Sequence, residues 1–290
     1  MNYRVNHRTA FRYSQAVSVS HQVLHLSPRS SARQRVSRAA IEFDPVPVVR
    51  DERIDFFGNT VTYVTIQEPH DELTVTSRFN VEVQPSPGPG FDLSEHWEHV
   101  AERVATPTEA DAIVASQFAF ASPYVTWDSE VRDFALESFV SDRPLLTSVR
   151  ALTARIHRDF KYEGNVTDVW TPVQRVLADR RGVCQDFAHL EIACLRSLGL
   201  AARYVSGYLR TNPPEGKERL VGADASHAWI GVWCPDVGWV EFDPTNNVVP
   251  SDEHVTVAWG RDYGDVSPIN GFIVGGGAHA VSVGVDVSPA

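Results

Sequence analysis

The hydrophobic pattern of the chain changes at a cluster of prolines and glycines, Pro85-Ser-Pro-Gly-Pro-Gly90. Before the cluster, runs such as residues 60–66 and 73–79 alternate in polarity and are rich in β-branched and aromatic side chains, as strands are. The cluster can neither continue a β-ladder nor begin a helix, because proline lacks the amide hydrogen and fixes its own φ. We therefore predict an N-terminal β-rich domain over residues 1–88, with the boundary at the cluster.

Beyond the cluster, apolar residues recur at the spacing of helices. Residues 129–140 and 147–160 each carry one apolar stripe, and a Thr-Pro pair is typical of a helix start that leads into residues 173–179. We expect the fold class to be α+β. Within it, residues 89–144 form a helical connecting segment, and residues 145–290 form a second domain with a C-terminal extension.

The chain carries a formal net charge of −11 over 290 residues. Binding to nucleic acid or to an anionic membrane surface needs a basic face, so we expect neither partner. Residues 1–50 are an exception, because eight arginines against Glu42 and Asp44 give this end a charge of +6 and leave −17 for the rest. Solvated or protected strand faces explain this basic end as well as an anionic partner does.

No stretch approaches the roughly 18 to 20 uninterrupted apolar residues that a membrane helix needs. The first residues, MNYRVNHRTAFRYSQ, also lack the apolar core of a signal peptide. We therefore expect a cytoplasmic protein, and the sequence leaves its oligomeric state open.

The sequence holds three cysteines, which cannot all be paired and whose separations match no common zinc or redox motif. A cysteine is commonly a small buried apolar residue, and Cys194 falls in the apolar stripe of a predicted helix that runs from Phe187 to a closing Gly199. Cys184 differs, because Gly182 supplies a flexible turn and the cysteine then falls at the start of that helix. Unpaired backbone N–H groups and the positive end of the helix dipole favour a thiolate there.

Two β-runs, residues 226–233 and 238–243, are joined by the short segment Cys234-Pro-Asp-Val-Gly238. A connection of this length with proline and glycine is typical of an antiparallel hairpin. Folding the hairpin about the middle of that segment brings His227 opposite or diagonal to Asp243 on the same face, within side-chain reach.

A nucleophilic thiol needs a base, a group that fixes the tautomer of the base, and donors for the oxyanion. The sequence offers Cys184 as the nucleophile, His227 as the base and Asp243 as the orienting carboxylate. The backbone N–H of Cys184 can donate to the oxyanion. A His and an Asp on neighbouring strands are often only a hydrogen-bonded surface pair, so the setting of the cysteine is what favours catalysis.

The same residues resemble those of a known family. The segments Gly182-Val-Cys-Gln-Asp-Phe-Ala-His189, Ser226-His-Ala-Trp229 and Gly238-Trp-Val-Glu-Phe-Asp-Pro-Thr-Asn246 look like the cysteine, histidine and aspartate blocks of the bacterial transglutaminase-like superfamily. Residues 7–29 resemble the β-rich N-terminal region of such proteins, and residues 260–268 resemble their usual extension. The resemblance implies an N-terminal antiparallel β domain followed by a papain-like core, in which the cysteine helix packs on an antiparallel sheet that carries His and Asp.

Other residues of these blocks have weaker assignments. Relatives often place an indole or an amide beside the oxyanion, and Trp170 and Gln185 are the candidates here, with a structural role equally open for Trp170. Asp186 and His189, in the first turns of the cysteine helix, are predicted to be structural. No pair of histidines has ligand spacing and no acidic loop of the EF-hand type is present, so we expect no metal and no other cofactor.

The implied chemistry is acyl transfer on a peptide or protein amide: the thiolate attacks the carbonyl, a thioester forms, and water or an amine resolves it. We expect hydrolysis, as by a cysteine peptidase or amidohydrolase, with protein-glutamine crosslinking as the alternative. Two rival classes are a binding module on the same fold with a vestigial triad, and a redox thiol protein, although no C-x-x-C motif is present.

Overall fold

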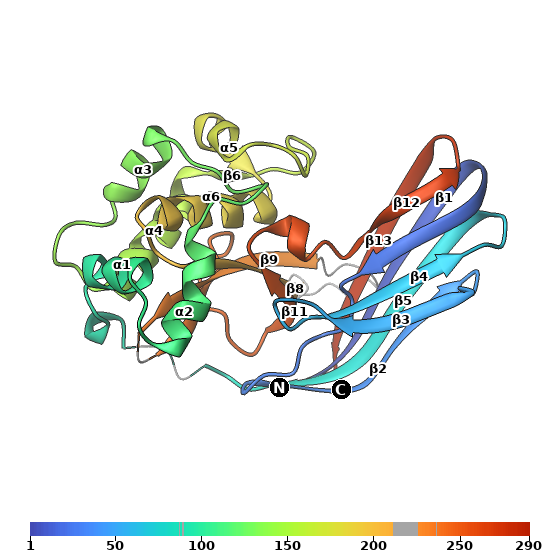
Figure 1. The fold of residues 1–290 in the computed structure, drawn as a ribbon, viewed down its shortest axis with the longest axis horizontal. Coiled ribbons are helices and arrows are strands. Elements are labelled where there is room, and N and C mark those ends of the chain that lie inside the picture. Colours follow the sequence, from blue (N-terminus) through green and yellow to red (C-terminus); the bar gives the residue numbers. More distant parts are fainter. Residues whose placement is uncertain (87, 89, 211–225, 236) are drawn as a thin grey trace, which may run out of the picture.

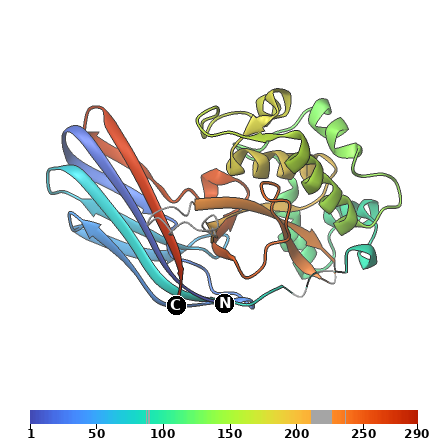
Figure 2. The same ribbon diagram turned by 180° about the vertical axis from the view of Figure 1, so that it is seen from behind.

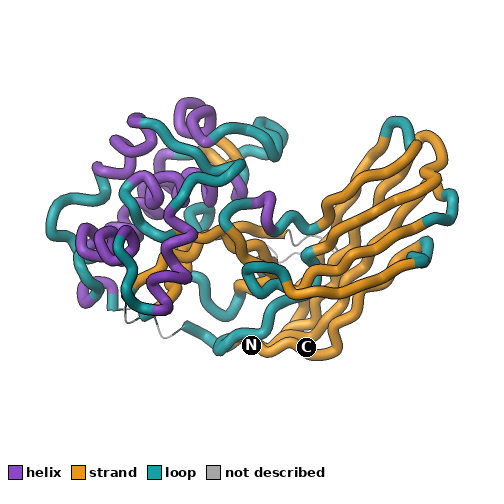
Figure 3. Tube along the Cα trace, viewed as in Figure 1, coloured by secondary structure: helices purple, strands orange, loops and turns teal. Residues whose placement is uncertain are grey.

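The computed structural model describes residues 1–86, 88, 90–210, 226–235 and 237–290. The chain forms a larger and a smaller antiparallel sheet together with a set of helices, so the predicted α+β class is confirmed (Figure 1). The helices gather around the smaller sheet, while the larger sheet stands to one side as a unit made of strands (Figure 3). A polar loop that the sequence predicts around residues 212–217 lies outside the described residues.

The larger sheet is organised by one long strand, β1 (Asn2–Leu24). The other strands are β2 (Gln34–Asp44), β3 (Val49–Ile54), β4 (Thr60–Ile66), β5 (His70–Val83), β12 (Ile269–Gly275) and β13 (His279–Pro289). The first half of β1 lies between β5 and β13, and its second half lies between β4 and β12. The outer strands β2 and β3 pair with β5 and β4, so every strand of this sheet is held directly or through one neighbour by β1.

The placement of the two C-terminal strands, β12 and β13, differs from the predicted division into domains. The sequence assigned residues 145–290 to one domain, whereas β12 and β13 pair with β1 of the N-terminal sheet. Alternation in polarity identifies a strand but does not say which sheet supplies its partner, and the free edge of β1 needs one. The N-terminal domain therefore contains both ends of the chain, which lie close together in both views (Figures 1 and 2).

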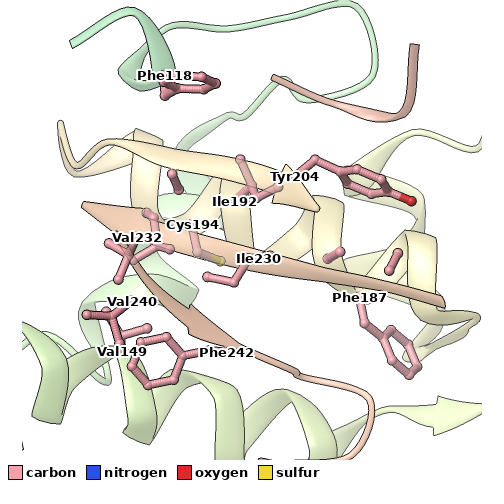
Figure 4. Close-up of a cluster of buried hydrophobic side chains, with 14 of the residues drawn as sticks. Phe118, Val149, Phe187, Ile192, Cys194, Tyr204, Ile230, Val232, Val240 and Phe242 are labelled. Carbon is pink, nitrogen blue, oxygen red and sulfur yellow. The ribbon is translucent and has the colours of Figure 1, made fainter. Parts of the chain in front are cut away.

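The smaller sheet carries the candidate site. It consists of β8 (Ala202–Leu209), β9 (Ser226–Cys234), β10 (Gly238–Phe242) and β11 (His254–Gly260), in the order β10-β9-β8-β11. The helix α6 (Cys184–Ser197) packs on one face and is buried over nearly its whole length. Figure 4 shows how the two layers meet: Ile192 and Cys194 of α6 lie against Ile230 and Val232 of β9.

Five further α-helices of the described residues lie on the side of the smaller sheet that holds α6, and most of their buried residues belong to the same apolar cluster. They are α1 (Trp97–Ala105), α2 (Ala110–Ser116), α3 (Ser129–Leu136), α4 (Leu145–Asp159) and α5 (Val173–Asp179). The last three correspond to the helices that the sequence predicts. α4 begins earlier than predicted, directly after Pro144, whose fixed φ suits a helix start. Among the described residues, no helix is long and apolar enough to cross a membrane.

Two carboxamides join the larger sheet to the edge of the smaller one. Gln34 accepts a hydrogen bond from the backbone N–H of Thr256 (2.9 Å) and donates to its carbonyl (2.6 Å). Asn59 does the same at Trp259, at 3.1 Å and 2.9 Å. Both target residues lie on β11, the edge strand of its sheet. Each side-chain amide therefore replaces the peptide group of a missing neighbouring strand and satisfies backbone groups that would otherwise be buried without partners.

Replacing Asn59 with alanine should destabilise the protein. The change removes the fully buried Asn59 amide and leaves the N–H and carbonyl of Trp259 without their partner. We expect a loss of about 2–3 kcal/mol in the free energy of unfolding, measured by urea denaturation. The matched control Asn270→Ala removes an exposed asparagine from β12 and should change the free energy by less than about 0.5 kcal/mol. Equal losses in the two variants would contradict the capping role.

Candidate active site

Cys184 is the first residue of α6, and the chain reaches it through an extended Val183 (φ −116°, ψ 179°). The carboxylate of Asp186 closes this end of the helix, because its Oδ2 accepts hydrogen bonds from the Val183 backbone N–H (2.8 Å) and the Thr167 hydroxyl (2.7 Å). Burial raises the pKa of Asp186, and these two hydrogen bonds oppose the rise. The half-buried sulfur thus lies at the positive end of a helix, which favours its ionised form.

Gly182 is required for a reason that the sequence does not reveal. Its φ is not in the left-handed region, so the predicted flexible turn is the wrong explanation for glycine at this position. A Cβ on residue 182 would lie 2.6 Å from Oδ2 of Asp186 and 2.9 Å from its Cβ. Glycine is needed because the capping carboxylate approaches the backbone closely.

The hairpin of β9 and β10 places His227 and Asp243 diagonal to each other. Its register pairs Phe242 with Ile230, so Asp243 follows opposite the residue two positions beyond His227. Nε2 of His227 lies 2.8 Å from Oδ2 of Asp243, and both side chains are buried. Cys184 and Asp243 both act on the imidazole of His227 and raise its pKa. Because Nε2 is occupied by the carboxylate, Nδ1 is the ring nitrogen left for the thiol.

Hydrogen bonds outweigh the effect of burial on the protonation states of His227 and Asp243. Burial alone would lower the pKa of His227, but its hydrogen bonds with Asp243 and Cys184 raise that pKa to about 10. Burial would likewise raise the pKa of Asp243, but hydrogen bonds from His227 and His254 hold it well below its usual range. The imidazole is therefore stabilised in the form that has accepted a proton, next to a permanent anion.

Five hydrogen bonds hold the Asp243 carboxylate. Oδ1 accepts from the backbone N–H groups of Thr245 (2.9 Å) and Asn246 (3.1 Å), in the turn that directly follows the aspartate. Oδ2 accepts from the Asn246 side chain (2.7 Å), from His227 and from Nε2 of His254 (3.1 Å). The turn after Asp243 thus fixes the carboxylate, and the side chain cannot rotate without breaking several bonds.

Sequence reasoning missed His254 as a partner of Asp243. It begins β11, eleven positions after the aspartate and in no recognisable motif. Trp229 packs edge-on against its ring, with centroids 5.2 Å apart and an interplanar angle of 82°. Trp229 is itself buried and donates its indole N–H to Glu241 (3.1 Å), so it contributes to the packing of the sheet. No local signal could have found His254, because its contact depends on the path of the chain after β10.

The contacts of His189, which follows the cysteine in α6, indicate a structural role. Burial lowers its pKa to about 3, so the ring is neutral at physiological pH. Its Nε2 accepts a hydrogen bond from the backbone N–H of Tyr263 (3.2 Å), and its ring lies 5.0 Å from that of Tyr204. His189 therefore ties α6 to the segment that follows β11.

Comparisons with known proteins agree with this geometry. The bacterial transglutaminase-like N-terminal region matches residues 3–82, and the transglutaminase-like superfamily matches residues 133–244, which hold Cys184, His227 and Asp243. The chain is 43% identical to an uncharacterized protein of Mycobacterium tuberculosis, over 99% of this chain and 92% of the relative. It is 33% identical to one of Mycobacterium leprae, over 98% of each. The chain belongs to the transglutaminase-like superfamily. The resemblance seen in the sequence is thereby confirmed.

A solved structure shares the fold of this superfamily member. A candidate cysteine protease from Cytophaga hutchinsonii superposes with a TM-score of 0.76, covering 99% of this chain and 90% of that one. The two are 20% identical, so the likeness concerns the fold. A shorter sequence match, 39% identical over 72 residues, links the chain to a protein-glutamine gamma-glutamyltransferase of Pseudomonas aeruginosa. That match covers 24% of this chain and 11% of the relative.

Of the predicted helpers of the oxyanion, Trp170 lies in the loop before α5, and Gln185 is the second residue of α6. Trp170 is 72% exposed, and its ring stacks on Tyr124 with centroids 4.9 Å apart. The Gln185 amide donates to the carbonyl of Val169 (3.3 Å), which holds the loop against the helix. In the described structure both side chains therefore have partners that support a structural role.

Three buried side chains could hold a metal ion, although the sequence predicts no metal. His227, Asp243 and His254 each place one ligating atom within 4.8 Å of the others. Both histidines already hydrogen-bond the carboxylate through Nε2, so an ion would have to replace those bonds. The grouping escapes sequence reasoning because the three residues have no ligand spacing.

Replacing Gly182 with alanine should disturb the cap of α6. The new Cβ would displace the Asp186 carboxylate, so we expect a loss of about 1–3 kcal/mol in the free energy of unfolding. Alkylation of Cys184 by iodoacetamide should slow in the variant, measured by mass spectrometry of the labelled peptide. Gly164→Ala is the matched control, because nothing lies within 4 Å of a Cβ at residue 164. A tolerated Gly182→Ala variant with unchanged alkylation would contradict the crowding argument.

The raised pKa of His227 makes stability depend on pH. Between its ordinary pKa of 6.5 and about 10, the folded protein holds a proton that the unfolded chain has lost. The stabilisation is therefore complete below pH 6.5 and is lost as the pH rises toward 10. We expect the free energy of unfolding to fall over this range with a slope of up to ~1.4 kcal/mol per pH unit, measured by urea denaturation.

The slope should be absent in His227→Gln and retained in His99→Gln, which changes an exposed histidine on α1. Parallel pH curves for the wild type and His227→Gln would show that His227 is not the group responsible.

Proposed function

We propose that the chain is a thiol enzyme of the transglutaminase-like type, which cleaves or transfers the acyl groups of peptide or protein amides. Cys184 is the nucleophile, His227 the base and Asp243 the group that orients the base. The observation that carries the proposal is the buried hydrogen bond of 2.8 Å between His227 and Asp243, on an imidazole whose pKa both Asp243 and Cys184 raise. Membership of the superfamily supports an enzyme of this class.

The reaction would begin from the thiolate of Cys184 beside the imidazolium of His227, whose Nδ1 holds the proton of the thiol. The sulfur attacks the carbonyl carbon, and the charge that develops on oxygen is stabilised by the backbone N–H of Cys184 at the start of α6. As the C–N bond breaks, His227 gives the proton to the leaving amine, and the acyl group stays on sulfur as a thioester. A second nucleophile, deprotonated by His227, then takes the acyl group and releases the thiolate beside the imidazolium. Asp243 holds the ring in one tautomer and orientation throughout.

Water is the acceptor that we favour for the thioester. Cys184 is only half-buried, and an open hollow lies beside the start of α6, lined by residues 165–175. Thr167, from that lining, hydrogen-bonds the Asp186 carboxylate that caps the cysteine helix, so the hollow adjoins this cap. Because Cys184 itself is only half-buried, an acyl group on its sulfur would be within reach of solvent. The proposed enzyme is accordingly a cysteine peptidase or amidohydrolase, and its cytoplasmic location stays a prediction.

Crosslinking is the second candidate, because of one sequence match. The Pseudomonas aeruginosa relative is a protein-glutamine gamma-glutamyltransferase, and it is 39% identical over the 72 matched residues. Transfer to an amine uses the same thioester as hydrolysis, so the triad accommodates both reactions. The two candidates differ only in which nucleophile resolves the intermediate.

The acceptor can be identified directly. The protein is incubated with a peptide library, with and without a labelled primary amine, and the products are identified by mass. We expect products that gain water, and a loss of roughly 10³-fold or more in their rate of formation in Cys184→Ala. Cys194→Ala, which removes a fully buried thiol from the apolar cluster of Figure 4, should keep the activity of the folded protein. Products that gain the amine would favour crosslinking, and products that persist in Cys184→Ala would contradict the assigned nucleophile.

The rate at which each cysteine is alkylated distinguishes an enzyme from a binding module on the same fold. Iodoacetamide should label Cys184 much faster than Cys194 or Cys234, because both of the latter are fully buried and burial raises the pKa of Cys194. His227→Ala should slow the labelling of Cys184 by about tenfold or more. Equal labelling of the three thiols would support the non-catalytic module.

A further inference from the structure

A second cavity lies on the face of the smaller sheet that is turned away from α6. Val240 and Phe242 point toward the helices (Figure 4), so Trp239 and Glu241, which alternate with them, point the other way. The cavity has a volume of about 360 Å³ and is closed on its far side by residues 29–34 of the N-terminal domain. Cavities of this size accommodate small molecules.

Three arginines line this cavity, against one acidic side chain, Glu241. Arg29 and Arg33 come from the N-terminal domain, and Arg203 comes from β8. The guanidinium carbons of Arg29 and Arg203 lie 3.6 Å and 3.8 Å from the centroid of the Trp259 ring, so both cations are held by the same indole. A concentration of positive charge in a chain of net charge −11 indicates a place where anions would be attracted.

Arg203 is buried without the hydrogen bonds that a buried arginine needs. It is 7% exposed, its ion pair with Glu241 spans 3.9 Å, and its Nε–H is buried without a partner in the part of the chain that the structure describes. Burial lowers its pKa to about 10, so the side chain is still charged at neutral pH. Arg29 also has an Nε–H that is buried and unpartnered among the described residues.

Arg196 provides an internal comparison. It is as deeply buried as Arg203, but its guanidinium donates to the carbonyls of Ala202, Phe120 and Arg261 and to the Ser122 hydroxyl. Arg196 is thus a structural arginine whose donors are used within the fold. The Nε–H of Arg203, in contrast, has no acceptor among the described residues, and Arg203 lines a cavity. This arrangement is expected when the acceptor comes from a ligand.

We propose that this cavity binds a small polyanion, a molecule that carries two or more carboxylate or phosphate groups. Such groups match the planar donors of guanidinium, and two of them can engage Arg203 and Arg33 on different sides of the cavity. The hydroxyls of Ser31, Ser86 and Ser251 also line the cavity and provide neutral donors. The enclosed volume suits a small molecule rather than a polymer.

The cavity also adjoins the candidate active site through His254. This histidine lines the cavity, donates through Nε2 to Asp243, and has an Nδ1 that is buried without a partner among the described residues. A polyanion bound to Arg203 would therefore lie against the residue that supports the catalytic carboxylate. The binding site itself does not rest on the proposed function, because it is defined by residues outside the Cys184 side of the sheet.

Isothermal titration calorimetry of the full chain tests the proposal, with citrate and inorganic pyrophosphate as probes and sodium chloride at matched ionic strength as the reference. We expect saturable binding of one molecule per chain with a dissociation constant below about 1 mM for at least one probe. Arg33→Gln should weaken that binding by about tenfold or more, and Arg203→Gln should weaken it further. Binding of citrate alone would identify carboxylate chemistry, and binding of pyrophosphate alone would identify phosphate chemistry.

The matched control is Arg35→Gln, which removes an exposed arginine two residues farther along the chain and lies outside the cavity. It should leave binding unchanged. If Arg203→Gln does not fold, Arg33→Gln decides the result, because Arg33 is less buried and, among the described residues, its guanidinium donates to the carbonyl of Gln84 alone. No saturation by either probe up to about 10 mM, or equal weakening in Arg33→Gln and Arg35→Gln, would overturn the proposal.

Discussion

The buried negative charge of Asp243 is the constraint around which the smaller sheet is organised. An ionised carboxylate with no exposure to solvent is costly unless hydrogen bonds replace its water. Five donors meet this need, and they come from the turn that follows β10, from the start of β9 and from the start of β11. The same bonds that make the charge tolerable fix the position of His227 and set its proton affinity. The stability of the smaller sheet and the protonation state of His227 therefore depend on the same hydrogen bonds.

The N-terminal domain takes part in this arrangement, although none of its residues reaches the triad. Gln34 holds the backbone of Thr256, which lies on β11 two positions from His254, and His254 donates to Asp243. Asn59 holds the same strand farther along, at Trp259. The edge of the smaller sheet is thus fixed by side chains of the larger one, and the position of the second histidine depends on that edge. The β domain acts as a support for the active site as well as one wall of the basic cavity.

Local patterns in the sequence were enough to predict the parts of the site that depend on neighbouring residues. The apolar stripe after Phe187 gave the cysteine helix, and the length of the β9–β10 connection gave the diagonal contact between His227 and Asp243. The parts that were missed depend on distant residues. His254 reaches Asp243 only because of the path of the chain after β10, and β12 joins β1 across almost the whole sequence. Periodicity carries no information on such pairings, because it describes a strand and not its partner.

The position of the last two strands also determines when the fold can be completed. β1 is made first, yet one of its edges is covered only by β12 and β13, and the N–H of Ala290 donates to the carbonyl of Asn2 (3.0 Å). During translation β1 keeps an open hydrogen-bonding edge until β12 and β13 have been synthesised. An uncovered edge of this length is a template for pairing with other chains. The nascent chain is thus exposed to aggregation until residues 269–289 are available, and a product truncated before them would keep that hazard.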